Sequence, residues 1–286
     1  MKICILTRTP NSYTEKRLIE EAKARDHEIS CVSPKDCVIA IEGHDASVKY
    51  LGEEIKVDAV IPRIPKRLSS YDRSVLRQLE TDEIYVLAKS LAIERSFDTI
   101  RTLQLIRKNE VSIQKTIIGK FDTNPELALR DFSAPVAIRS TSNDSDMVAT
   151  SHEKTARSLI RAFSSDTSFT IIQKVPSSGH RRDITGLVLG SSIIASIRKM
   201  SDGEYSSIKL NDETAKVIGK IARALGLTFC AVELIMYDGE YVVSKIDISP
   251  SIEPMEKTTN RNVAGKIIEY IEQNARRGQK KDKIGA

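Results

Sequence analysis

Cysteine and histidine are scarce in this chain of 286 residues, and neither is grouped. No Cys-x-x-Cys pair occurs, and three of the four cysteines lie within or beside apolar runs, which favours reduced core thiols over disulfides or a zinc site. The four histidines are equally scattered, so a metal site built on histidine has little support. These residues are Cys4, Cys31, Cys37, Cys230, His27, His44, His152 and His180.

Long apolar runs are also missing. No stretch of 18 or more apolar residues occurs, so we expect no segment that spans a bilayer. The opening MKICILTRTP is a short apolar run followed by Arg and Pro, which indicates a buried first strand and not a signal peptide, and we therefore expect a cytoplasmic protein. The turn after this run lacks a G-x-G-x-x-G pattern, which argues against a Rossmann dinucleotide site.

Excess positive charge is found in one place only. The net charge is +5, and the last eleven residues hold five basic side chains against Asp282, a net of +4. The rest of the chain is nearly neutral and lacks the basic face of a dedicated nucleic-acid domain. We interpret residues 276–286 as a solvated, disordered basic tail, with an arm that binds RNA or the ribosome as the weaker alternative.

The first 89 residues alternate between short apolar runs and helical spacing. Buried strands are predicted at 2–6, 27–32 and 58–64, and a helix is predicted at 12–25. Strand, helix and strand in this order are typical of an open parallel α/β sheet. Farther along, helical spacing covers 90–108, 212–225 and 262–275, and apolar runs predict strands at 135–139, 169–173, 180–190 and 193–197.

The most informative stretch is 231–272, where two apolar runs flank an Asp-Gly dipeptide and a helical pattern follows. It predicts a strand, a tight turn at Asp238 and Gly239, a second strand, a Ser-Pro-Ser loop and a helix. Glu233 ends the first run, and Asp247 lies near the end of the second. On paired antiparallel strands both carboxylates would reach one face, where they could hold a hard cation.

This stretch resembles the metal-binding end of the RimK-like glutamate ligases of the ATP-grasp family. The matching positions are Glu233, Asp247, Ser249-Pro250-Ser251 and EKTT at 256–259, with DAVIPRI at 58–64 and VLRQLE at 75–80 in the first domain. The resemblance covers nearly all of residues 1–275. It implies the α/β class and an ATP-grasp fold: an N-terminal open parallel α/β (pre-ATP-grasp) domain at 1–89, then an ATP-grasp region of two α+β subdomains at 90–275. It also implies ATP and Mg²⁺ as ligands.

Several positions differ from the pattern of that family. Thr99 stands where the family has a lysine that contacts ATP phosphates, and Arg139 stands for a lysine that reaches the nucleotide. Lys174 replaces a glutamate beside the adenine hinge, and Thr185 replaces the arginine that follows the retained Asp183. A short neutral threonine cannot replace a phosphate-directed ammonium, so these changes weaken the expected nucleotide site.

Two further differences concern the phosphates and the metal. The family has a glycine-rich loop over the phosphates, whereas residues 140–146 read STSNDSD, without glycine and with two carboxylates that repel a triphosphate. Lys245 stands where the family has a metal-ligating glutamate. We therefore expect Glu233 and Asp247 to pair with Lys245 and Arg139 in preference to holding magnesium.

These differences leave three interpretations in the order in which the sequence favours them. The first is a binding or regulatory subunit that has lost ATP-dependent ligase chemistry, binds no ATP or Mg²⁺ and needs no cofactor. Each lost group removes roughly 1–3 kcal/mol from binding or from transition-state stabilisation. The second is an active ATP-dependent carboxylate–amine (glutamate) ligase with rearranged ligands. The third is a nucleic-acid- or ribosome-associated protein that acts through its basic tail.

The sequence also suggests an association surface. Arg63 follows a proline at a predicted strand end, where a cleft or an interface would supply its partner. The segment 66–77 mixes basic residues with apolar ones, including Tyr71 and Leu76. We expect a homo-oligomer, or a hetero-oligomer with an active ATP-grasp homologue, built through the first domain. A solvated amphipathic helix is the commoner explanation of such a pattern.

Overall fold

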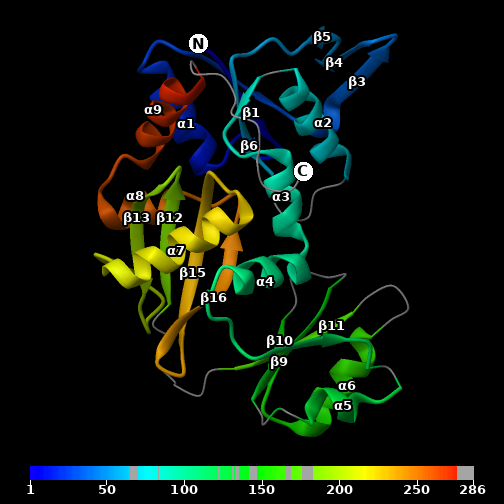
Figure 1. Cartoon of the computed structure of the whole chain (residues 1–286). Helices are drawn as coiled ribbons and strands as arrows, with labels where there is room; N and C mark the ends of the chain where they lie inside the picture. Colours follow the sequence, from blue (N-terminus) through cyan, green and yellow to red (C-terminus); the bar gives the residue numbers. More distant parts are fainter. Residues whose placement is uncertain are drawn as a thin grey trace.

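The structure is a computed structural model of the chain, and it describes residues 1–64, 70–82, 84–121, 123–130, 132, 135–141, 147–164, 169–175 and 183–275. Figure 1 shows three parts: an N-terminal domain at the top, a central sheet below it, and a smaller sheet domain at the lower right. The basic tail expected at 276–286 and most of the 140–146 loop lie outside the described residues.

The N-terminal domain is built on a parallel sheet, as the sequence predicts. Its strand order is β2-β1-β6-β7, and every described pairing within it is parallel. Apolar side chains on both faces of β1 and β6 are buried, because helices cover each face. The elements are β1 (Lys2–Thr7), α1 (Tyr13–Lys23), β2 (Glu28–Val32), β6 (Ala59–Arg63), α2 (Ser70–Thr81) and β7 (Tyr85–Val86).

A small antiparallel sheet projects from this domain between β2 and β6, and the sequence did not predict it. Its order is β3-β4-β5, and α2 packs against β3 and β4. Much of it is exposed, with Ile41 at 76% relative accessibility, so its apolar pattern is too weak to stand out in the sequence. The elements are η1 (Pro34–Asp36), β3 (Cys37–Glu42), β4 (Asp45–Tyr50) and β5 (Glu53–Glu54).

The helical pattern at 90–108 forms two helices, α3 (Ser90–Phe97) and α4 (Thr99–Lys108). Asp98 interrupts the pattern because its backbone is extended, with φ −81° and ψ 99°, and its side chain accepts a hydrogen bond from the Arg101 amide. A carboxylate in this position caps the start of a helix. The chain therefore turns at Asp98 before it enters the smaller sheet domain (Figure 1).

The smaller sheet domain is antiparallel, with the order β10-β9-β11-β8. One face packs against α6 through a compact core that includes Ile138, Ile160 and Ile172. The strands β9 and β11 agree with the runs predicted at 135–139 and 169–173. The elements are β8 (Thr116–Gly119), α5 (Pro125–Leu129), β9 (Val136–Ser140), β10 (Val148–Thr150), α6 (Glu153–Phe163) and β11 (Thr170–Lys174).

The central sheet is antiparallel, with the order β14-β13-β12-β15-β16. The hairpin turn predicted between its last two strands is present, and both Asp238 and Gly239 have positive φ, at 48° and 88°. The elements are β12 (Ile184–Leu189), β13 (Ser192–Lys199), β14 (Tyr205–Ser207), α7 (Asp212–Leu225), β15 (Phe229–Tyr237), β16 (Glu240–Asp247), α8 (Glu253–Thr259) and α9 (Val263–Ala275).

Helix α7 covers one face of the central sheet. A Cβ added to Gly186 of β12 would lie 2.7 Å from the Cδ1 atom of Ile218, so glycine allows the helix its close approach. The side chains of Val232 and Leu234 point into the same core as α7, which leaves Ala231 and Glu233 on the other face of β15. The second face is therefore the one on which α8 and the candidate site lie.

Buried polar contacts join helix α1 to the segment 249–256. Arg63, 8% exposed, donates through Nε to Glu15 Oε1 at 3.2 Å and through Nη1 to the Pro250 carbonyl at 2.8 Å. Glu256 accepts from the Tyr13 hydroxyl at 2.9 Å and from Arg17 Nε at 3.1 Å. The N-terminal domain therefore fixes the loop that follows β16, and we call this set of contacts the junction.

The cysteines lie as the sequence predicts. All four are free thiols, and three of them are buried. Burial, with a smaller contribution from the Asp247 charge, raises the pKa of the Cys230 thiol to about 12. Cys230 is consequently protonated at neutral pH and is neither a nucleophile nor a metal ligand there. No helix in the described parts of the chain is long and apolar enough to cross a membrane.

Candidate active site

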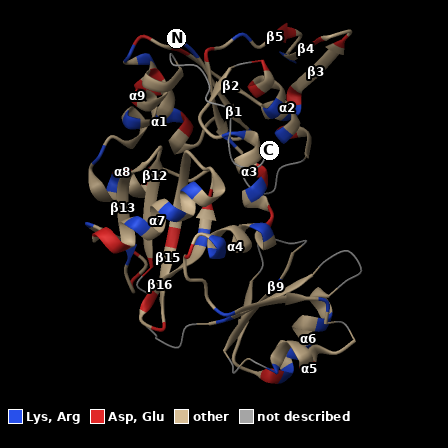
Figure 2. Cartoon of the chain, viewed as in Figure 1, with Lys and Arg blue, Asp and Glu red and all other residues tan. Residues whose placement is uncertain are grey.

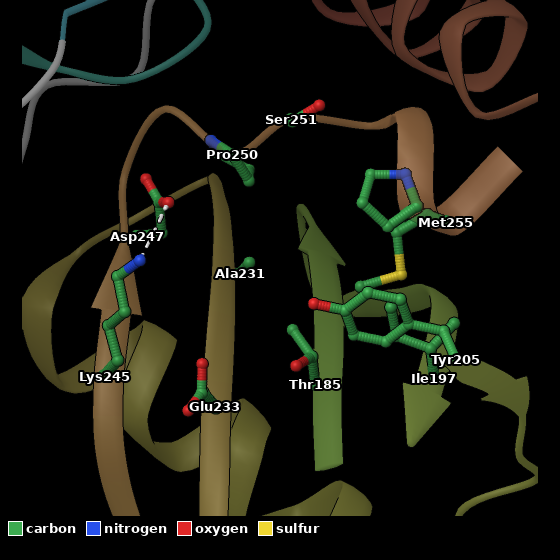
Figure 3. A pocket seen from close by; sticks show the side chains of 11 residues that line it. Thr185, Ile197, Tyr205, Ala231, Glu233, Lys245, Asp247, Pro250, Ser251 and Met255 are labelled. Carbon is green, nitrogen blue, oxygen red and sulfur yellow. Dashed lines mark ion pairs between the residues drawn. The ribbon is translucent and has the colours of Figure 1, made fainter. Parts of the chain in front are cut away.

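A cavity of about 250 Å³ lies on the face of the central sheet opposite α7. Figure 3 shows that its charged side chains come from β15 and β16, whereas the ring of Tyr205 and the thioether of Met255 lie on the other side. One wall is therefore ionic and the other largely apolar. The described lining residues are Thr185, Ile197, Tyr205, Ala231, Glu233, Lys245, Asp247, Pro250, Ser251, Pro254 and Met255.

Strand register brings the ionic side chains together. Glu233 lies opposite Lys245 and also opposite Thr185 of β12, while Asp247 lies opposite Ala231. Lys245 and Asp247 are two residues apart on one strand, so their side chains share a face. The sequence-based expectation that both carboxylates reach one face is thus confirmed.

A bulge in β16 makes this arrangement compatible with the core. The register shifts beside Glu233, so that Leu234 pairs with Val243 although Glu233 pairs with Lys245. The extra residue lets Val243 and Ile246, which are three apart, both point into the core beside α7. Lys245 is thereby turned toward the cavity.

The charges in the cavity are only partly withdrawn from water. The Lys245 Nζ atom lies 3.7 Å from Asp247 Oδ2, and the two side chains are 62% and 38% exposed. The expected pairing of Asp247 with Lys245 is therefore present, as a solvent-screened contact (Figure 3). Asp247 Oδ1 also accepts a hydrogen bond from the Ser249 amide at 3.0 Å, which orders the start of the following loop.

Other residues chosen from the sequence lie elsewhere. Thr99 begins α4, and Asp183 lies just before β12, 8% exposed. Arg139 and Lys174 belong to β9 and β11 of the smaller domain. By strand alternation Lys174 shares the face of Ile138 and Ile172 that packs on α6, whereas Arg139 is on the opposite face. None of these four is among the described residues that line the cavity, and the expected pairing of Glu233 and Asp247 with Arg139 stays a prediction.

The residues assigned to a cleft or interface have different surroundings. Arg63 reaches the cleft mouth, because its partner Pro250 lines the cavity. Tyr71 is 41% exposed and donates its hydroxyl hydrogen to the Cys37 carbonyl. Leu76 is fully buried in the core of the N-terminal domain, so its expected place at an association surface is wrong. Leu76 lies on the apolar face of the amphipathic helix α2, and this face packs on the sheet.

The apolar wall was missed in the sequence. Ile197 and Ala231 look like core residues of any strand, and Met255 and Pro254 follow the Ser-Pro-Ser loop without a distinctive spacing. Tyr205 lies in a three-residue strand, which gives little periodic signal. Only the pairing of β13 with β14 and the docking of α8 bring these side chains together.

The acidic residues of the cavity do not fit a pair of magnesium ions. Two carboxylates are present among the described lining residues, together with one ammonium. Among all described residues, no group of three or more His, Cys, Asp and Glu side chains is arranged so that it could hold a metal ion. Mg²⁺ is usually held by one or two carboxylates together with phosphate oxygens and water, and the adjacent Lys245 ammonium repels it.

Comparison with known proteins assigns the chain to a family. A family model described as the RimK PreATP-grasp domain matches residues 1–93, and one described as the RimK-like ATP-grasp domain matches residues 96–271. A probable alpha-L-glutamate ligase from Maridesulfovibrio salexigens is 32% identical over 99% of both chains. One of the same name from Legionella pneumophila is 33% identical over 96% of this chain and 97% of the relative.

Solved structures agree on the fold. The ATP-grasp ligase PsnB, complexed with a minimal precursor, has a TM-score of 0.78 at 16% identity, and the match covers 95% of this chain and 97% of that one. A D-alanine–D-alanine ligase from Bacillus anthracis, complexed with ATP, has a TM-score of 0.73 at 15% identity over 97% of each chain. At these identities the similarity shows the ATP-grasp fold alone.

These relatives correct one prediction. The sequence favoured a binding or regulatory subunit without ligase chemistry, and the relatives that match nearly the full length contradict it, because they are named as ligases. Single side chains that differ from the family pattern do not outweigh a similarity over nearly the full length, which favours the second interpretation, a ligase with rearranged ligands. With both family models matched in order and the ATP-grasp fold present, the chain belongs to the RimK-like ATP-grasp family.

Proposed function

We propose that the protein is an ATP-dependent carboxylate–amine ligase whose ligands are rearranged around the cavity on the central sheet. The observation that carries the proposal is the nearly full-length similarity to relatives named probable alpha-L-glutamate ligase. Glutamate is therefore the first amine substrate to test. ATP is the proposed cosubstrate, and Mg²⁺ would accompany its phosphates.

Such a ligase joins a carboxylate to an amine in two steps. The carboxylate first takes a phosphoryl group from ATP, and the amine then displaces phosphate from the acyl phosphate. Both steps move negative charge, so a cation beside the reacting groups stabilises them. The Lys245 ammonium is the cation that the described cavity lining offers. It is 62% exposed and thus accessible to an anionic reactant.

The attacking amine must be held and must lose a proton. Carboxylates bind an ammonium group and can accept a proton from it in the second step. Glu233 and Asp247 face the cavity for this purpose, with Thr185 beside Glu233 as a hydroxyl partner. The apolar wall of Ile197, Tyr205 and Met255 would exclude water from the opposite side.

The proposal is tested by following ADP formation. Purified protein is incubated with ATP, Mg²⁺ and a panel of amino acids that includes glutamate, and ADP release and new amide products are measured. We expect turnover that depends on the amino acid. Replacing Glu233 by Gln or Asp247 by Asn should lower the rate at least tenfold, because each removes a charge that faces the amine.

A matched control lies far from the cavity. Glu110 is 87% exposed and makes only a long contact to Lys220 at 3.8 Å, so Glu110→Gln changes the same kind of group at a different place. It should leave the rate unchanged. Absence of ADP formation with every amino acid, or equal rates for Asp247→Asn and the unchanged protein, would contradict the proposed function.

A further inference from the structure

The cavity contains a resident cation where the fold leads one to look for a metal. Lys245 is the cross-strand neighbour of Glu233, and its Nζ atom lies 3.7 Å from Asp247. The described lining therefore contains two carboxylates and one ammonium on a single face of β15 and β16 (Figure 3). This arrangement is fixed by the strand register and by the bulge in β16, and it follows from the fold of this chain.

We propose that the Lys245 ammonium takes the place of a divalent cation between Glu233 and Asp247 and prevents this carboxylate pair from binding one. The inference rests on the proposed function in one respect, because it concerns the same cavity. It assigns the two carboxylates to an amine instead of a metal. A divalent ion that takes part in the reaction arrives with the triphosphate.

Charge supports this role. A bound dication would lie within a few ångströms of the Lys245 ammonium and be repelled by it. The described lining holds no third acidic side chain that would offset this repulsion. Lys245 itself needs no coordination shell, since an ammonium has three donors and stays largely solvated.

The exposure of the Lys245 side chain suits a charge that serves in catalysis. A lysine that is 62% exposed can leave Asp247 for an incoming anion at little cost, because the ion pair is screened by water. A metal held by several carboxylates could not move in this way. The pair of Lys245 and Asp247 thus keeps the cavity partly neutral until a reactant binds.

The test is a titration of the protein with Mn²⁺ alone, without ATP or amino acid, followed by the electron paramagnetic resonance signal of free Mn²⁺. We expect the unchanged protein to bind Mn²⁺ only in the millimolar range. Lys245→Glu places a third carboxylate in the cavity, and it should tighten Mn²⁺ binding at least tenfold. Adding Asp247→Ala to that variant, which removes the second oxygen ligand, should abolish the gain.

Two controls isolate the effect of the position. Lys154→Glu makes the same charge change at an exposed site on α6 and should leave Mn²⁺ binding unchanged. Circular dichroism checks that each variant is folded, and Lys245→Gln, which removes the ammonium without adding an acid, replaces Lys245→Glu if the latter does not fold; a smaller tightening is then expected.

Three outcomes would overturn the inference. One is micromolar Mn²⁺ binding by the unchanged protein that is lost in Asp247→Asn. Another is Lys245→Glu binding no more tightly than the unchanged protein, and a third is an equal gain for Lys154→Glu. Because the titration contains no substrates, its result is independent of turnover, and a failure of the ligase assay with the expected Mn²⁺ results would refute the proposed function alone.

Discussion

The junction and the cavity both contain ion pairs, but those at the junction are withdrawn from water and the one in the cavity is exposed to it. At the junction Arg63 and Glu15 are 8% and 1% exposed, and further hydrogen bonds reach both. In the cavity Lys245 and Asp247 are 62% and 38% exposed, at a longer distance of 3.7 Å. Asp247 lies only nine positions along the chain from Glu256, which belongs to the junction.

Charge has a structural role at the junction and a chemical role in the cavity. Breaking a buried pair leaves a charge without water or partner, so the cost is large even when the pair itself contributes little net stability. Breaking an exposed pair costs little, because water replaces the partner. The junction therefore holds the N-terminal domain on the loop after β16, and the cavity keeps its charges available. In Figure 2 the basic and the acidic residues are interspersed along the ribbon of the described chain.

The largest effect is expected from Arg63→Met. It leaves Glu15 buried without its charged partner and the Pro250 carbonyl without its donor. The free energy of unfolding should fall by about 3–5 kcal/mol. Chemical denaturation followed by circular dichroism measures this.

The double variant Glu15→Met/Arg63→Met provides the matched control. With no buried charge left, it should recover part of the lost stability. If Arg63→Met costs less than about 1 kcal/mol, the junction is not the buried ionic contact described above.

An intermediate effect is expected from Glu256→Gln. Glu256 is 8% exposed and accepts hydrogen bonds from Tyr13, Arg17 and the Ala264 amide. Gln keeps the shape but loses the charge, so we expect unfolding to become easier by about 1–3 kcal/mol. Denaturation at two salt concentrations tests the reason, because a buried contact should respond little to salt.

A smaller effect is expected from Arg8→Ala. Arg8 is 36% exposed, whereas its partner Asp72 is fully buried, and the closest N–O distance is 2.6 Å. The exposure of this pair lies between that of the junction pair and that of the cavity pair. We therefore expect the free energy of unfolding to fall by about 1–2 kcal/mol in the same denaturation assay. A loss as large as that of Arg63→Met would show that exposure of one partner does not determine the cost.

The smallest effect on stability is expected from Lys245→Ala. The free energy of unfolding should change by less than about 0.5 kcal/mol, because the contact is exposed. In the ligase assay the same variant should lose most of its turnover, since it removes the cation of the cavity. A variant with lower stability and normal turnover would reverse the comparison between the two regions.

Much of the fold could be predicted from the sequence. The apolar runs at 2–6, 27–32 and 58–64 predicted the parallel sheet because its central strands β1 and β6 are buried on both faces and are therefore mainly apolar. The caps of α7 were equally legible, since Asn211 accepts from the Thr214 amide and Gly226 has a φ of 73°. The exposed strands β3 to β5 have no buried apolar run and no helix cap beside them, so the sequence did not predict them.

Only the ionic part of the candidate site could be predicted from the sequence. Glu233 is a charged residue inside the apolar run of β15, and Asp247 ends β16, so both stand out in the sequence. The apolar wall has no such contrast, because Ile197 and Met255 resemble core residues until strand pairing places them at a cavity. Leu76 was misplaced for a similar reason, because an apolar side chain suits an interface as well as the core in which Leu76 lies.

The sequence by itself determined most of the elements, the two-domain family pattern and the two carboxylates of the strand hairpin, because periodicity, turns and caps act over a few residues. The tertiary structure decided which charges meet. The bulge in β16 turns Lys245 toward Glu233 and Asp247, and strand alternation sends Arg139 and Lys174 to opposite faces of another sheet. Such long-range register depends on the packing of the whole core, which no local pattern encodes.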